Sequence, residues 1–578
     1  MSRPTKAQLK QWLASPAPIS DLREQLRQSP TTPLMLDAMR REIPGVTEIP
    51  QVTYTLFREF EHNGQRDGYQ IPYFYKRAQL ARSVLEWVMG DAGMRDAVQD
   101  LAWSICEETS WVLPAHEEQG PGYWDLIPPR ARTWPLGAHT MLTREPDSID
   151  LFCAETGAIL AETVYLVGDK LAPEVRQRIR QEVERRIFKP YLAYARDHWW
   201  FKGALNWNGV CNGSIGLAFL RLENDLETLA EALSLVLEGF EAYIATGFES
   251  DGGSIEGVGY WNYGLMYYVT LADLLRELSG GALDLLAQPR LRDIAAYPLG
   301  MSLVAPDRFI NFGDSTERTI LAPGIANRLA ERTGVHELRA LFAPLGSTSS
   351  FNRYDFAKMV ISVRNAVWWD ATQARPPLEQ RDFFLPDSGL AKFVGRTASG
   401  KTTVLAVTAG HNDGHHSHTD VASFVLNIGG ESLLPDPGRG LYSKDYFRQQ
   451  RYENIFNNSY SHHVPRIGGQ LQAAGPEFGG HQQFHGTLVE RHSGDQSKSA
   501  VIDFHTAYNL PTLTQARRTL ELEPHTGMVK LVDEFGFAGS PLEIEEAFST
   551  WFPVSAAGNT ARIQGQQTSL ELKVIEPA

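Results

Sequence analysis

The stretch HNDGHHSHTDVASFVLNIGGESLLPD (residues 411–436) joins a polar cluster rich in histidine to an alternating apolar segment. Apolar residues recur at every second position from Ala422 to Ile428, and Leu433–Leu434 follow a Gly429–Gly430 turn. Alternation with a period of two is typical of a β-strand, and a glycine pair between two such runs is typical of a hairpin turn. We therefore predict a β-hairpin whose first strand begins within or just after the histidine cluster.

The polar cluster carries four histidines and two aspartates between residues 411 and 420. If this segment is extended, alternate residues share a face, so His416, His418 and Asp420 point the same way. Asp436 at the end of the second strand and the later His462 could close beside His418, giving a two-histidine, one-carboxylate set suited to zinc. A hydrogen-bonded polar cluster at a sheet rim is the alternative. The density of imidazole and carboxylate groups favours the metal site.

Short alternating segments dominate the chain after a polar breaker at Gly346–Ser350. Such segments are typical of antiparallel strands in a large sandwich, so we assign residues 351–578 to an antiparallel β-sheet domain. The segments are Met359–Val363, Ala391–Val394, Thr403–Thr408, Ser423–Ile428, Ala500–Phe504, Leu513–Leu522 and Met528–Phe535.

The first part of the chain is helical in pattern, with apolar residues at three- and four-residue spacing between Pro and Gly breakers. Helices in series without interspersed strands predict a helical array or toroid over residues 1–350, and no repeat of fixed period is present. The predicted helices are Arg77–Met89, Met94–Leu113, Ser148–Val167, Glu174–Tyr194, Leu226–Ala245, Tyr260–Leu278 and Leu291–Leu303.

Composition limits the classes of function. The 578 residues are 43% hydrophobic, which is typical of a globular protein of two or more domains. A formal charge of −15 argues against a nucleic-acid partner, and no apolar run is long enough to span a membrane. The N-terminal segment lacks a signal-peptide pattern and the three cysteines are widely spaced, so we expect a cytoplasmic protein with reduced thiols, or a periplasmic one if a leader was removed. The oligomeric state stays open between monomer and dimer.

Two segments of the helical part are too rich in polar and aromatic residues to be simple core. NWNGVCNG (206–213) precedes the predicted helix Ser214–Leu222, and capping explains one of its three asparagines. SDGGSIEGVGYWNYG (250–264) lacks the lysine of a nucleotide loop, and its aromatic, Asn and Glu side chains are typical of a carbohydrate cleft. NFGDS (311–315) by itself predicts an ordinary turn.

Four basic residues follow Asp436: Arg439, Lys444, Arg448 and Arg451. They could line a cationic cleft for an anionic substrate. From the charges alone, a solvated surface helix is favoured.

Taken together, these motifs resemble the heparinase II/III-like polysaccharide lyases, especially the branch with exolytic oligoalginate lyases and exo-heparinases. The resemblance implies an (α/α) toroid followed by an antiparallel β-sandwich, an α+β multidomain class. The motifs are in family order and span residues 200–475: NWNGVCNG (206–213), EGVGYWNYG (256–264), NFGDS (311–315), HHSHTD (415–420), LLPDPGRGLY (433–442) and RYENIFNNSYSHHVPRIGGQLQAAG (451–475).

The resemblance implies roles for individual residues. Asn212 matches the residue that neutralises the uronate carboxylate, Tyr260 the catalytic tyrosine and His416 the catalytic histidine. The metal positions are His418, Asp436 and His462, which we expect to bind a zinc ion with a mainly structural role. Ser417, Thr419 and His463 depart from the usual residues, so Tyr263 and His415 remain alternatives for the catalytic pair. The residues expected to bind substrate are Trp207, Asn208, Glu256, Trp261, Tyr263, Arg439 and Tyr442.

The expected chemistry is β-elimination of a 4-linked uronide, in an anionic oligosaccharide that could be alginate, heparin or heparan sulfate, hyaluronan or chondroitin. An amide such as Asn212 would stabilise the enolate dianion, while Tyr and His move protons. Exolytic action is expected from the absence of a leader and from the 451–475 motif. The alternatives are zinc-dependent hydrolysis, a paired-carboxylate glycosidase using Asp251 and Glu256, and a carbohydrate-binding protein without activity.

Overall fold

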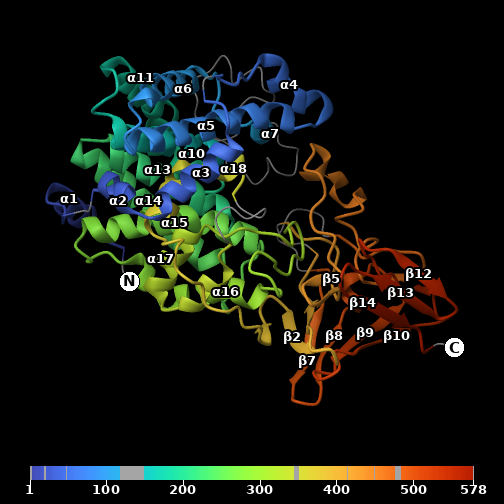
Figure 1. Cartoon of the computed structure of the whole chain (residues 1–578). Helices are drawn as coiled ribbons and strands as arrows, with labels where there is room; N and C mark the ends of the chain where they lie inside the picture. The colour runs from blue at the N-terminus through green and yellow to red at the C-terminus, as the bar shows by residue number, and fades with distance from the viewer. Residues whose placement is uncertain are drawn as a thin grey trace.

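The computed structural model describes residues 3–18, 21–46, 48–117, 149–343, 351–412, 414, 416–447, 449–474 and 483–576. Within them, helices occupy the chain up to Val367 and strands begin at Phe383 (Figure 1). The predicted class, a helical toroid followed by antiparallel sheets, is confirmed. The predicted breaker at 346–350, together with Asp413, His415 and Arg448, lies outside the described residues.

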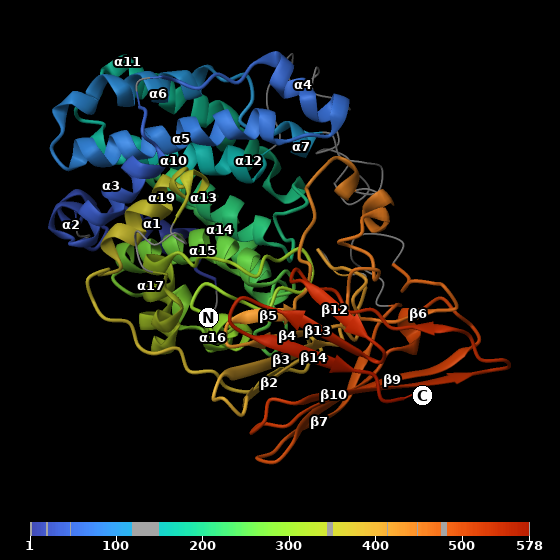
Figure 2. The same cartoon turned by 45° about the vertical axis from the view of Figure 1, so that its right-hand side comes forward.

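The helical domain packs its longest helices side by side, as two views of the chain show (Figures 1 and 2). Each helix predicted from the sequence is present, with shifted bounds. The helices are α1 Lys6–Ala14, α2 Leu22–Gln28, α3 Thr31–Glu42, α4 Tyr54–Asn63, α5 Asp67–Val88, α6 Arg95–Glu107, α7 Pro114–Glu117, α10 Leu151–Val167, α11 Pro173–Val183, α12 Lys189–Tyr194, α13 Asn206–Leu222, α14 Leu226–Thr246, α15 Val258–Leu278, α16 Arg290–Met301, α17 Pro323–Thr333, α18 Arg353–Phe356 and α19 Met359–Val367.

Helix α13 lies at the centre of this packing, in contact with α10, α14 and α15. It approaches α15 closely because glycine occupies the contact positions: a Cβ at Gly209 would lie 2.6 Å from the Gly264 carbonyl oxygen, and one at Gly213 2.8 Å from the Tyr267 backbone. The NWNGVCNG segment is thus the first two turns of α13, and our prediction that it precedes the helix was wrong.

The β-sheet domain contains a five-stranded sheet in the order β1-β2-β3-β4-β5 and a four-stranded sheet in the order β10-β9-β8-β7. A three-stranded sheet, β12-β13-β14, and the pair β11-β6 complete it. The strands are β1 Phe383–Leu385, β2 Leu390–Arg396, β3 Thr402–Thr408, β4 Phe424–Ile428, β5 Glu431–Leu434, β6 Arg466–Ile467, β7 Thr487–Ser493, β8 Lys498–Asp503, β9 Leu513–Leu522, β10 Val529–Phe537, β11 Ile544–Glu545, β12 Val554–Ala557, β13 Thr560–Gln564 and β14 Ser569–Lys573.

Both faces of the five-stranded sheet are buried. In β3, Val404 and Ala406 pack into the core of the helical domain, whereas Leu405 and Val407 pack against the four-stranded sheet. This double burial explains why the central strands read as nearly continuous apolar runs. The predicted β4–β5 hairpin is confirmed, and its first strand begins after the histidine cluster.

One predicted strand is a helix. Met359–Val363 lies in α19, which packs against α3 and α17 and is buried along most of its length. A short apolar run does not distinguish a buried helix from a buried strand. The helical domain therefore continues beyond the boundary that we placed at 350/351.

Candidate active site

The centre of the site is a contact between loops of the two domains. His416 lies just before β4 with a φ of 61°, and its carbonyl oxygen accepts a hydrogen bond of 2.9 Å from the backbone N–H of Asp314. A Cβ at Gly313 would lie 2.6 Å from that oxygen, so this approach requires glycine. His416 is therefore not extended, and the condition for the shared face of His416, His418 and Asp420 is not met. A left-handed residue at such a junction is typical of functional sites.

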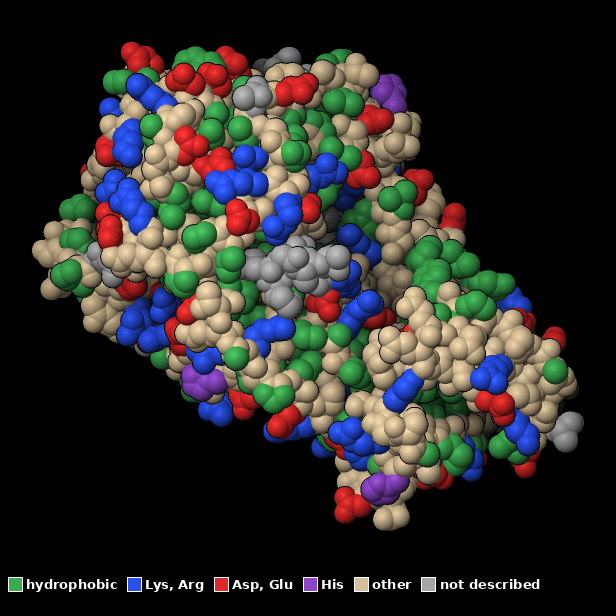
Figure 3. Space-filling view, viewed as in Figure 1, with side chains coloured by type: hydrophobic (Ala, Val, Ile, Leu, Met, Phe, Trp, Pro, Cys, Tyr) green, Lys and Arg blue, Asp and Glu red, His purple; other side chains and the backbone are tan. Residues whose placement is uncertain are grey.

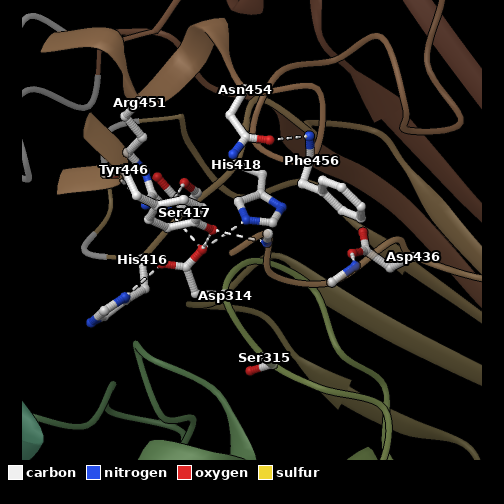
Figure 4. A network of polar contacts seen from close by, with 12 residues as sticks. Asp314, Ser315, His416, Ser417, His418, Asp436, Tyr446, Arg451, Asn454 and Phe456 are labelled. Carbon is white, nitrogen blue, oxygen red and sulfur yellow. Dashed lines mark hydrogen bonds and ion pairs between the residues drawn. The ribbon is translucent and has the colours of Figure 1, made fainter. Parts of the chain in front are cut away.

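The Asp314 carboxylate binds both histidines of the cluster (Figure 4). Its Oδ2 lies 2.7 Å from Nδ1 of His416, and its Oδ1 lies 2.9 Å from Nε2 of His418 and 3.0 Å from the guanidinium of Arg451. The Tyr446 hydroxyl also donates to Oδ1. Burial alone would raise the pKa of Asp314, but Arg451 and the two histidines hold it well below its usual range. Asp314 is thus a carboxylate that fixes which nitrogen of each ring carries the proton.

The Tyr260 ring, in the first turn of α15, stacks on His416 with ring centres 4.4 Å apart. Its hydroxyl shares a 2.6 Å hydrogen bond with the hydroxyl of Tyr442, and the guanidinium of Arg439 lies 4.7 Å from the Tyr442 ring centre. Burial raises the pKa of both phenols, which are therefore protonated at neutral pH. The alternative tyrosine, Tyr263, contacts Tyr267 and Lys358 instead.

Glu256 connects His416 to the first residue of α13. Its Oε1 lies 3.6 Å from Nε2 of His416 and accepts a hydrogen bond of 2.8 Å from the Asn206 side-chain amide. Its Oε2 accepts a hydrogen bond of 2.6 Å from the backbone N–H of Asn206. Burial raises the pKa of the Glu256 carboxyl. The amide at this site is thus Asn206.

The structure corrects the role given to Asn212. Its side chain is fully buried; Oδ1 accepts from the Tyr191 hydroxyl at 2.7 Å and Nδ2 donates to Asn208 at 2.8 Å. Because the segment is helical, Asn208 and Asn212 are one turn apart and share the inner face of α13. Asn206 lies on a different face of the helix. Treating the segment as a loop hid this difference.

Two further residues expected to bind substrate belong to the core. Trp261 is buried and donates to the carbonyl of Ile294 at 2.8 Å, and Asn208 is buried against Gly203. Trp207 is half-buried and packs on the ring of His116. The predicted residues that the structure brings together are therefore Tyr260, His416, Glu256, Tyr442 and Arg439.

His418, Asp436 and His462 place one ligand atom each within 4.8 Å of one another. The second nitrogen of each ring has its own acceptor: Nε2 of His418 faces Asp314, and Nε2 of His462 lies 3.2 Å from the Phe456 carbonyl oxygen. Nδ1 of His418 is buried with no hydrogen-bond partner among the described residues. Such oriented imidazoles beside a carboxylate fit a zinc ion. His463 differs, because both ring nitrogens face backbone carbonyls, those of Phe424 and Ser549.

The sequence analysis did not assign three residues to this network: Asp314, Tyr446 and Arg451. NFGDS was noted but given no role, although an aspartate in a motif shared with the family was the available signal. Arg451 is buried against Asp314, so it belongs neither to a solvated helix nor to an open cationic cleft.

A cavity of about 570 Å³ lies between the domains beside this network. Its lining includes Glu256, Tyr297, Leu385, His416 and His418. A pocket of this size is typical of small-molecule and oligosaccharide sites. Figure 3 shows the surface hollowed between the two domains, with Lys and Arg side chains beside the hollow.

Comparisons with known proteins agree with this architecture. Residues 377–545 match the family model "Heparinase II/III-like, C-terminal". No curated protein sequence matches the chain. A crystal structure of heparinase III superposes with a TM-score of 0.55 at 14% identity, covering 96% of this chain and 77% of that one. A mutant of heparan sulfate lyase HepC from Pedobacter heparinus gives 0.53 at 14% identity, covering 95% and 81%. The resemblance read from the motifs is confirmed at the level of the family: residues 377–545 match the heparinase II/III-like C-terminal domain, and the fold of the chain is that of heparinase III. The assignment to the exolytic branch stays a prediction.

Proposed function

We propose that this protein is a polysaccharide lyase that cleaves 4-linked uronides by β-elimination. The observation that carries the proposal is the stacking of Tyr260 on His416, whose Nδ1 is fixed by a buried carboxylate. The family of the C-terminal domain and the fold shared with heparinase III support it.

In the proposed reaction His416 is the base. Because Nδ1 donates to Asp314, Nε2 keeps its lone pair and takes the C5 proton of the uronate. Tyr260 is protonated, since burial raises the pKa of its hydroxyl, and it gives its proton to the O4 leaving group. Each transfer contributes about 10²–10⁴-fold.

The second requirement is to stabilise the enolate dianion that forms when the C5 proton leaves. Asn206 and Glu256 lie beside His416, where the substrate carboxylate must be placed. Glu256 has a pKa raised by burial, so its carboxyl can share a proton with the substrate carboxylate as charge develops.

A zinc ion held by His418, Asp436 and His462 would cross-link the segments that carry His416. The three ligands are only 0%, 4% and 1% exposed, so the described residues leave little room for a substrate to reach the ion. This burial disfavours zinc-dependent hydrolysis. The glycosidase pair is also disfavoured, because Asp251 accepts backbone hydrogen bonds from Gly253 and Asp387.

We propose glycosaminoglycan oligosaccharides as the substrate class, with alginate as the alternative, and exolytic cleavage. Purified protein is incubated with heparan sulfate, chondroitin, hyaluronan and alginate while ultraviolet absorbance follows the unsaturated uronide product. Absorbance should rise with at least one polymer; saturated products or none would refute the lyase. A defined tetrasaccharide should release mono- or disaccharide from the first turnover, whereas a ladder of mid-sized fragments from polymer would show endolytic cleavage.

A further inference from the structure

The turn between α4 and α5 contacts the segment that follows β5, far away in the sequence. Gly64 closes α4 with a φ of 75°, and a Cβ there would lie 3.0 Å from the Cβ of Lys444. Lys444 donates to the carbonyl of Glu61 at 3.2 Å. This contact places the α4–α5 turn, which carries Arg66, against the segment that carries Arg439 and Tyr442. The charges and hydroxyls of Tyr260, Tyr442 and Arg439 accordingly influence the Arg66 guanidinium.

Arg66 is held by a histidine rather than by a carboxylate. Its Nη2 lies 3.1 Å from Nε2 of His116, whose Nδ1 lies 2.7 Å from Oδ2 of Asp150. Asp150 is itself fixed as the N-cap of α10. Burial lowers the pKa of the His116 ring, consistent with a neutral tautomer that donates to Asp150 and accepts from Arg66. The guanidinium is therefore positioned by a neutral ring, and among the described residues it forms no direct ion pair with a carboxylate.

Arg66 is partly buried and Arg439 is exposed. The fully buried arginines among the described residues have carboxylate partners. Arg77 lies 2.8 Å from Glu108, and Arg518 lies 2.6 Å from Asp533. Among the described residues, neither Arg66 nor Arg439 forms an ion pair with Asp or Glu, and Nε of Arg66 is buried without a hydrogen-bond acceptor. Two guanidinium groups that face the same region without a carboxylate partner among the described residues leave donors available for an anion.

We propose that Arg66 and Arg439 form an anion-binding site beside the Tyr260–Tyr442 pair, which takes a carboxylate or sulfate of the bound sugar. Arg66 comes from the helical domain and Arg439 from the β-sheet domain, so the anion bridges the two domains. A guanidinium suits either group because it presents planar paired donors. His116 and Asp150 are positioning residues. The substrate assignment rests on the proposed lyase function; the anion site does not.

The binding test uses the full chain and two probes, inorganic sulfate and glucuronate, measured by calorimetric titration at constant ionic strength. At least one probe should bind wild-type protein, and the identity of that probe separates sulfate from carboxylate recognition. Arg66→Ala and Arg439→Ala should each weaken binding about tenfold or more. Arg66→Lys should retain part of the affinity, and His116→Ala should weaken binding without removing either cation.

The control is Arg562→Ala, an exposed arginine on β13, which should bind like wild type. Circular dichroism confirms that each variant is folded. The proposal is overturned if neither probe binds wild type, or if Arg66→Ala binds like wild type.

Kinetics give a second readout where a polymer is cleaved. Arg66→Ala and His116→Ala should raise KM about tenfold while kcat changes much less, and the KM difference should shrink in high salt. A loss confined to kcat would overturn the recognition role. If no polymer is cleaved, the lyase proposal fails while the titrations still decide whether the anion site exists.

Discussion

At the scale of single residues, the carboxylate of Asp314 orients both a proposed catalytic residue and a proposed metal ligand. Asp314 gives one oxygen to His416 and the other to His418, so the proposed base and a proposed metal ligand are oriented by the same side chain. A change in either histidine therefore affects the hydrogen bonding of the other. Effects of substitutions around Asp314 should consequently be non-additive.

Tyr260→Phe removes the proposed acid while keeping the ring that stacks on His416. We expect β-elimination to fall by at least about 10²-fold with unchanged folding. Absorbance gain measures the rate and circular dichroism the fold. Tyr268→Phe, a buried tyrosine on the same helix, is the matched control and should keep most activity. Equal rates for the two variants would remove Tyr260 from the mechanism.

Asn206→Ala and Asn212→Ala separate the site from the core. Asn206→Ala should lower kcat about tenfold or more, because the amide beside Glu256 is lost. Asn212→Ala removes the hydrogen-bond partner of the Tyr191 hydroxyl and that of the Asn208 Oδ1. It should therefore lower the unfolding free energy by about 1–3 kcal/mol and change kcat little in the folded fraction. The reverse pattern would restore the assignment made from the sequence.

The sequence was sufficient to group Tyr260, His416 and the metal set, because residue type and order carry that information. It was insufficient to decide whether Asn206 or Asn212 belongs to the site, because that depends on which face of α13 each residue occupies. It was also insufficient for Asp314 and Arg451, whose roles arise only when two loops about a hundred residues apart meet.

At the scale of elements, the histidine cluster is an irregular segment that precedes the β4–β5 hairpin and contacts it. The strands are buried and paired with each other. The residues before them are held by Asp314 and by the His418–Asp436–His462 set. The apolar residues of the two runs identified the hairpin because the side chains of both strands are buried. The same rule misassigned α19, where a short apolar run is buried on all sides of a helix.

Removal of a metal ligand should loosen this segment. His418→Ala and His462→Ala should each lose bound zinc and lower the melting temperature, because metal binding stabilises only the folded chain. Elemental analysis of protein purified without a histidine tag gives the metal content. His463→Gln is the control, since both of its nitrogens face backbone carbonyls, and it should retain the metal. Full metal content in both alanine variants would place the ion elsewhere.

At the scale of the whole molecule, the two domains are joined through the five-stranded sheet and a buried lysine. Lys392 on β2 donates to the carbonyl of Ser302 at 2.9 Å and to Gln380 at 3.2 Å. Burial lowers the pKa of this ammonium from 10.5 to about 7. The order of the two domains was predictable from the change of periodicity, whereas this contact between them was not.

Lys392 should make stability depend on pH. Between pH 7 and 10.5 the unfolded chain binds the proton and the folded chain does not, so this stabilisation is present above pH 10.5 and lost as pH falls through about 7. The unfolding free energy of wild type, relative to Lys392→Met, should therefore rise by roughly 5 kcal/mol across that window. Chemical denaturation at several pH values measures it, with exposed Lys530→Met as control. A pH-independent difference would show an unperturbed lysine.

The double burial of the five-stranded sheet also bears on how the chain is made. The helical domain leaves the ribosome first, and its face that will receive Leu385, Leu390 and Val404 stays uncovered until those strands have been synthesised. Without the helices, one apolar face of the five-stranded sheet would be exposed to solvent. During synthesis we therefore expect a stage in which this apolar surface is accessible to chaperones and to other copies of the chain. That stage ends when β1, β2 and β3 pack against the helices.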